Sequence, residues 1–228
     1  GNDDITFGSG NNTIWGDYET EIFSGGQSLD GNDIIVGQKL SIAGTLRVYG
    51  GGGVDLITSR TADVIAVGGS GNDYITLLNP LLQALVYADS LPSSGNTLPS
   101  ELATDGNDEV TITYTPGSHY QALNATVFGS GGADKITIDN IASVTIFGGS
   151  NVDTIKVTRV GNATVYGDKL FEDTDDGGDT ISVDGANATI LASGGDDRIR
   201  LTVTNAYEVH GGSGVDNVSV TGTLAGQT

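Results

Sequence analysis

Aspartate recurs along the chain in one short sequence context. Each copy reads Asp, any residue, and then Ile or Val. The ten copies begin at Asp3, Asp33, Asp55, Asp73, Asp108, Asp134, Asp153, Asp179, Asp197 and Asp216. Carboxylate oxygens are the hard ligands that Ca²⁺ prefers, so a fold that gathers these residues could bind cations.

The spacing of these aspartates predicts that they stack. Successive copies are 18 to 35 residues apart, and the shortest spacings are 18 or 19 residues. If each copy opens one coil of a repeat, the carboxylates lie about 5 Å apart, the separation of neighbouring β-strands. Two such charges repel by roughly 1 kcal/mol in water and up to about 3.5 kcal/mol at an effective dielectric of 20. Either a divalent cation between coils offsets this repulsion, or each Asp caps a turn amide without metal.

The composition excludes several classes of partner. The chain has 29 acidic and 9 basic residues among 228, a formal net charge of −20. We therefore expect neither nucleic acid nor an anionic membrane as a partner, because both are negatively charged. Cysteine is absent, which rules out disulfides and thiolate zinc sites. The chain lacks Met and opens in the middle of a repeat, so we expect it to be a fragment of a longer repetitive protein.

Two alternating strand patterns must position the aspartates. The Asp-containing phrase is one. The other reads small residue, Thr-like residue, β-branched residue, aromatic residue, Gly, as in 125–129 and 163–167. Both have the period-2 alternation of short strands, and glycine clusters mark the turns. A unit of about 18 residues with two strands cannot bury its own apolar face, but stacked units can. We predict one all-β domain, 1–228, folded as a parallel β-solenoid (β-roll or β-helix) of about 9–10 coils.

Insertions interrupt the repeat after every third coil. They begin after Asp17, Asp89 and Asp168, each preceded by a Trp or Tyr and a small residue, and end at Asp33, Asp108 and Asp179. The chain therefore divides into super-repeats of roughly 17–88, 89–167 and 168–228. We expect the insertions to form loops along one edge of the rod.

The turn before the first strand carries a recognisable motif. Residues 50–58, 68–76 and 211–219 fit G-G-x-G-x-D-x-U-x at every position, and near fits begin at Gly129 and Gly148. This pattern resembles the hemolysin-type calcium-binding repeat of the RTX proteins. The opposite turn, for example 59–62 or 160–163, lacks the motif, so the chain is similar to a one-sided, degenerate variant of that repeat.

The resemblance implies a ligand set and a cofactor. RTX-like modules bind Ca²⁺ between consecutive coils through the motif aspartate and turn carbonyls. Carried onto this chain, the metal ligands are Asp33, Asp55, Asp73, Asp108, Asp134, Asp153, Asp179, Asp197 and Asp216. We expect calcium along one edge only.

One further pattern, the aromatic residues of the second phrase, admits both a functional and a structural interpretation. The last side chain of the second phrase is aromatic in six of nine copies (Trp15, Tyr49, Tyr87, Phe128, Phe147 and Tyr166), which predicts either a sugar-binding platform or a stabilising stack. The basic residues Lys156, Arg159, Arg198 and Arg200 are scattered among repeat positions without a cluster. No acid–base or nucleophile constellation stands out, so we do not expect an enzyme.

These patterns favour a structural role. We expect a calcium-stabilised segment of a large secreted or cell-surface protein, such as an adhesin, surface layer or filament, which acts as a rigid spacer or assembly unit. Its partners would be calcium ions and other copies, bound end to end or laterally. The alternative is a carbohydrate-binding or RTX-like secretion module of a secreted polysaccharide-acting enzyme, with surface glycans as partners.

Overall fold

The computed structural model describes residues 1–8, 10–17, 31–37, 41–80, 82–89, 106–115, 124–168 and 176–222. Within these ranges every regular element is a β-strand, and no helix is long and apolar enough to cross a membrane. The strands are β1 (Asp4–Phe7), β2 (Asn12–Trp15), β3 (Ile34–Gly37), β4 (Ser41–Gly52), β5 (Leu56–Ser59), β6 (Thr61–Ser70), β7 (Tyr74–Leu78), β8 (Gln83–Tyr87), β9 (Glu109–Thr113), β10 (Asn124–Ser130), β11 (Lys135–Asp139), β12 (Ser143–Gly149), β13 (Thr154–Tyr166), β14 (Thr180–Leu191), β15 (Arg198–His210) and β16 (Asn217–Thr221).

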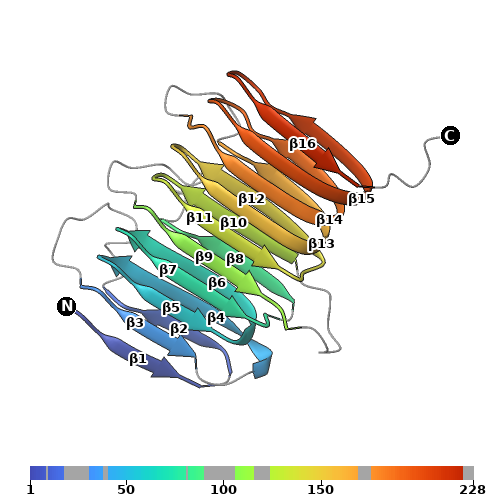
Figure 1. Ribbon diagram of the computed structural model, residues 1–228. Helices are drawn as coiled ribbons and strands as arrows, with labels where there is room; N and C mark the ends of the chain where they lie inside the picture. The colour runs from blue at the N-terminus through green and yellow to red at the C-terminus, as the bar shows by residue number, and fades with distance from the viewer. Residues whose placement is uncertain are drawn as a thin grey trace, which may run out of the picture.

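All strand pairs are parallel, and the coils stack from the N-terminus to the C-terminus (Figure 1). A first sheet joins β1, β3, β5, β7, β9 and β11, continues through the leading parts of β13, β14 and β15, and ends at β16. A second sheet joins β2, β4, β6, β8, β10 and β12 to the trailing parts of β13, β14 and β15. In the described chain, the ten aspartate phrases form the first sheet and the nine aromatic phrases form the second. The predicted all-β parallel solenoid is therefore confirmed.

The core lies between the two sheets. Alternate side chains of each strand point inward, and they superpose from coil to coil because the pairing is in register, as for Ile57 and Ile75. One continuous cluster of buried residues runs through the described coils from Ile14 to Val203. The short inner strands thus contribute one to three buried apolar residues each, and stability comes from stacking rather than from any single coil.

The glycine-rich turns at one edge have the backbone conformation expected from their sequence. Gly69 and Gly71 have φ angles of 118° and 113°, a region that residues with a Cβ rarely occupy. At the opposite edge, Asn79 and Asn140 take the left-handed conformation instead, with φ of 54° and 59°. The two edges of the rod therefore differ in turn chemistry, in agreement with the one-sided motif.

The interiors of the insertions, 18–30, 90–105 and 169–175, lie outside the described residues, so their predicted alignment along one edge is not addressed by the structure. Their anchoring residues are described. Asp17, Asp89 and Asp168 each follow a second-sheet strand at the glycine-rich edge.

Candidate metal-binding column

The ten motif aspartates form a continuous hydrogen-bonded column, which we call the aspartate ladder. The backbone N–H of each Asp donates to Oδ1 of the Asp one coil further along. Among the described residues this bond occurs nine times, from Asp3 to Asp216, with N···O distances of 2.6 to 3.1 Å. Each sequence-predicted ligand is therefore placed directly above another, because parallel in-register strands repeat every residue position at the strand spacing.

The ladder lies inside the rod rather than on its surface. Asp55, Asp73 and Asp153 have no exposed side-chain surface, and the other ladder residues from Asp33 to Asp197 are at most 3 % exposed. Only the two end members, Asp3 and Asp216, reach solvent appreciably. Burying a carboxylate costs free energy unless a hydrogen bond or a cation compensates for its lost hydration. The partners of the second oxygen of each carboxylate therefore determine whether the ladder can bind cations.

In most ladder members that second oxygen, Oδ2, lies against a glycine at the end of a second-sheet strand, as Asp73 does at Gly68 and Asp179 at Gly167. In Asp33, Asp73, Asp153, Asp179 and Asp197, Oδ2 is buried and has no hydrogen-bond partner. A Cβ placed on Gly148 would overlap both Asp153 Oδ2 and the carbonyl oxygen of Gly167 in the next coil. Carboxylate and carbonyl oxygens from neighbouring coils therefore converge on this corner, and such hard oxygen donors suit Ca²⁺.

Burial raises the pKa of five ladder carboxyls, those of Asp33, Asp73, Asp153, Asp179 and Asp197, and neighbouring aspartates raise it further. The pKa of Asp153 is raised to about 10, with burial as the largest cause and Asp134 as the next. Burial likewise raises the pKa of Asp179 to about 8 and of Asp197 to about 6, and it raises the pKa of Asp73 well above its ordinary value. Without a cation, the column is therefore stable only if many of its members hold a proton.

The donor set fits a cation only when backbone carbonyls take part. Among the described residues, no three His, Asp or Glu side chains converge closely enough to hold a metal by themselves. Oδ1 already accepts a backbone N–H in every ladder member beyond Asp3, which realises the amide-capping alternative. Oδ2 and the turn carbonyls remain as the oxygens that a Ca²⁺ ion could use. The two interpretations thus apply to different oxygens of one carboxylate.

Three further carboxylates at this edge, Asp17, Asp89 and Asp168, are marked by the sequence as the starts of insertions. Asp89 Oδ1 accepts the N–H of Gly106 at 3.1 Å and Oδ2 that of Gly131 at 3.2 Å. Asp168 does the same with Gly177 and Gly194, at 3.1 and 3.0 Å. Each of these residues, which we call clamp aspartates, joins the two ends of an insertion and ties them to the next coil. Their recurrence after an aromatic and a small residue was the available signal.

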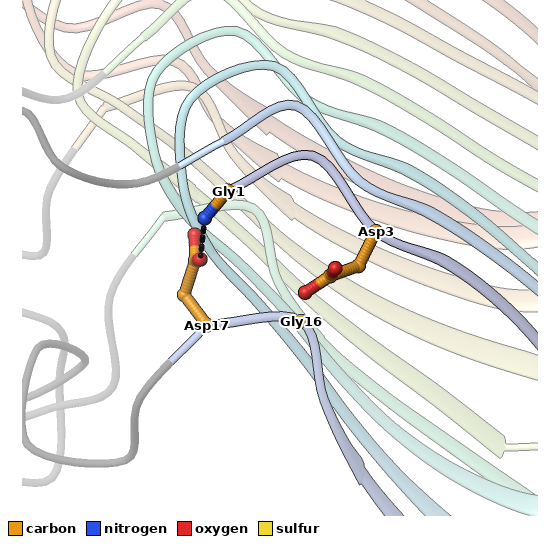
Figure 2. A pocket seen from close by; sticks show the side chains of 4 residues that line it. All are labelled: Gly1, Asp3, Gly16 and Asp17. Carbon is orange, nitrogen blue, oxygen red and sulfur yellow. Dashed lines mark hydrogen bonds and ion pairs between the residues drawn. The ribbon is translucent and has the colours of Figure 1, made fainter.

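Asp17 is the clamp aspartate of the first coil, and it shares a hollow with the ladder. The hollow has a volume of about 270 Å³ and is lined by Gly1, Asp3, Gly16 and Asp17. Figure 2 shows the carboxylates of Asp3 and Asp17 on its two sides, with the Gly1 ammonium 3.5 Å from Asp17 Oδ1. The clamp and the ladder are also electrostatically coupled further along, because Asp168 raises the pKa of Asp179. A coil that contains a clamp aspartate therefore has one more carboxylate beside the ladder than the other coils have.

The aromatic column exists, and its geometry distinguishes the two interpretations. Tyr87, Phe128, Phe147 and Tyr166 stack with centroid separations of 4.7 to 5.0 Å and interplanar angles of at most 6°. Both faces of the two phenylalanine rings are therefore covered by other rings. A sugar binds an aromatic side chain by stacking on a free face, so the interior of this column supports packing between coils and not a sugar platform.

Comparison with protein-family models, with curated proteins and with solved structures finds no match for this chain.

Proposed function

We propose that this chain is a calcium-stabilised structural segment of a large secreted or cell-surface repetitive protein, where it acts as a rigid spacer or assembly unit. The observation that carries the proposal is the buried aspartate ladder, in which Oδ2 of Asp33, Asp73, Asp153, Asp179 and Asp197 has no hydrogen-bond partner. Burying a column of carboxylates costs free energy, and divalent cations at these five oxygens offset that cost. The resemblance of the turns to RTX calcium-binding repeats supports the same assignment.

Calcium fits better than other common cations. The donors that the proposal uses at the glycine-rich edge, ladder Oδ2 atoms and turn carbonyls, are hard oxygens, and the chain has no Cys. Ca²⁺ accepts six to eight such oxygens in flexible geometry at about 2.3–2.6 Å, whereas Mg²⁺ demands near-octahedral order. Extracellular modules bind calcium with dissociation constants of about 10⁻⁴–10⁻³ M, so a secreted or surface location matches sites built from shared carbonyls.

The proposal is tested by removing calcium. Far-ultraviolet circular dichroism and small-angle X-ray scattering are recorded at pH 7.5 in calcium, in EDTA, and in EDTA followed by excess calcium. We expect EDTA to remove much of the β signal and to expand the chain, and calcium to restore both, because metal binding and folding are linked. Unchanged spectra and dimensions in EDTA would show that the ladder does not need calcium.

The carbohydrate-binding alternative needs a surface other than the aromatic column, because the rings there cover one another. The role as a secretion module depends on which domains neighbour this segment: a catalytic domain beside it would favour that role, and further super-repeats of about 75 residues would favour the structural one.

A further inference from the structure

The outer surface of the first sheet gathers basic residues that the sequence spaces far apart. Strand register places Lys156, Ser182 and Arg200 in one row across β13, β14 and β15. The adjacent row contains Thr180 and Arg198. We call Lys156, Arg198 and Arg200 the basic patch. Three of the four basic residues that are scattered in the sequence are therefore neighbours in the fold, because the insertion between Asp168 and Asp179 hides the common coil position of Lys156 and Arg200; Arg159 lies outside this group.

The basic patch has no acidic partner among the described residues. All three of its side chains are exposed and make no ion pair with another described residue. Neighbouring cations differ in this respect: Lys135 bonds Glu109 at 2.7 Å, and Arg159 pairs with Asp139. On β14 and β15 the outward acid Asp184 is paired in register with Thr202, in the row next to that of Ser182 and Arg200, and it makes no ion pair with a described residue. In a chain of net charge −20, three unpaired cations on one sheet face are a distinct local feature.

A hollow of about 200 Å³ lies beside two of these cations. It is lined by Arg198 and Arg200 of β15 and by Asn217, Ser219 and Thr221 of β16, together with Ile199. The guanidinium groups supply charged donors, and the amide and hydroxyl groups both donate and accept hydrogen bonds. This combination matches a ligand that carries anionic groups and many hydroxyls.

We propose that the basic patch binds a linear anionic polysaccharide that runs along the rod axis. Lys156 and Arg200 are two coils apart, which at the strand spacing is about 10 Å, so the patch suits charges that are spaced at intervals along a polymer. Nucleic acid carries about one charge per 1.7 Å of duplex, so the remaining acidic surface repels it more strongly than a glycan whose charges are more widely spaced. The flat, rigid face with polar side chains between the cations favours a carboxylated or sulfated glycan over an acidic peptide, which offers few hydroxyl groups.

The test uses the full chain in calcium and short oligosaccharides that stay soluble with calcium. Isothermal titration calorimetry compares an oligogalacturonate, a sulfated galactan oligosaccharide and a neutral glucan of equal length. We expect the anionic oligosaccharides to bind and the neutral one not to bind. The triple variant K156Q/R198Q/R200Q should weaken binding about tenfold or more, because each charge-assisted contact contributes a few-fold in affinity. The carboxylated and sulfated arms identify which anionic group is preferred.

The control is R47Q, because Arg47 is an exposed cation on β4 of the second sheet. It changes the net charge without touching the patch and should leave affinity within about twofold. The conservative variant K156R should also retain binding, since a cation remains in the row. Circular dichroism establishes that all variants are folded. Equal binding by the triple variant, binding of the neutral glucan, or tighter binding of a polyglutamate peptide or single-stranded DNA would each overturn the proposal.

Discussion

Substituting Asp153 separates the two roles that its carboxylate combines. Asp153 is fully buried, Oδ1 accepts the backbone N–H of Asp134 at 2.8 Å, and Oδ2 has no hydrogen-bond partner. Asn keeps the Oδ1 acceptor and removes the negative charge, whereas Ala removes both. If the charge destabilises the calcium-free protein and calcium offsets it, Asn must stabilise that protein more than Ala does.

The magnitudes follow from the raised pKa of Asp153. Because that pKa is about 10, Asp153 keeps its proton in the folded, calcium-free protein at pH 8, and retaining it costs about 1.4 kcal/mol for each pH unit above the unfolded pKa near 3.9. Asn has no such cost, so D153N should stabilise the calcium-free protein by at least about 1–3 kcal/mol at pH 8. D153A leaves the Asp134 N–H buried without its acceptor, which costs about 1–3 kcal/mol. In saturating calcium both variants lose a ligand oxygen, and each kcal/mol lowers Tm by about 2–4 °C in a protein of this size.

The assay is the pH at which half of the circular dichroism signal is lost in EDTA, together with Tm in calcium. In EDTA this midpoint should move to higher pH in D153N and to a lower pH in D153A than in D153N, because Ala also leaves the Asp134 N–H without its acceptor. In calcium both variants should melt earlier than the parent. D184N provides the matched control, because Asp184 is an exposed carboxylate of β14 outside the ladder. A D153N variant that is less stable than the parent in EDTA would refute the reasoning.

Three further predictions follow from the same edge. In EDTA, acid should stabilise the fold. The pKa values of Asp197, Asp179 and Asp153 are raised to about 6, 8 and 10, so stability is fully present below the unfolded pKa near 3.9 and is lost as pH rises through these values. EDTA-treated protein should therefore melt at a higher temperature at pH 5 than at pH 8, and the opposite order would contradict the burial argument. D89N should speed amide exchange at Gly106 and Gly131 and lower the stability by roughly 1–3 kcal/mol, because an amide has only one oxygen for two N–H donors; unchanged exchange rates would disprove the clamp. G148A should cost about 1–3 kcal/mol by overpacking, whereas G8A, where an added Cβ meets nothing within 4 Å, should leave Tm unchanged; equal melting of the two variants would show that the corner is not tightly packed.

The repeat made much of the fold predictable. A phrase that recurs in every coil has to occupy the same place in each, so ten Asp phrases and nine aromatic phrases were enough to assign the strands of both sheets. The same logic placed Trp15 on Tyr49, whose rings stack at 4.0 Å. Glycines with positive φ could be assigned because the turn motif repeats them, as at Gly69 and Gly71.

The repeat does not predict the direction in which individual side-chain atoms point. The sequence indicates that Asp55 lies above Asp33, but not that Oδ1 bonds the N–H of the preceding coil while Oδ2 turns towards a glycine. The clamp role of Asp89 was hidden because it requires knowing that Gly106 and Gly131, 17 and 42 residues away, approach the same carboxylate. Lys156 and Arg200 share a row only after the intervening insertion is discounted.

Calcium anomalous scattering from crystals grown in calcium tests the central claim most directly. The account predicts anomalous peaks between coils at the glycine-rich edge, each about 2.3–2.6 Å from a ladder Oδ2 and from turn carbonyls of neighbouring coils. Well-ordered density in which every ladder Oδ2 contacts only protein, with no anomalous peak along that edge, would contradict it.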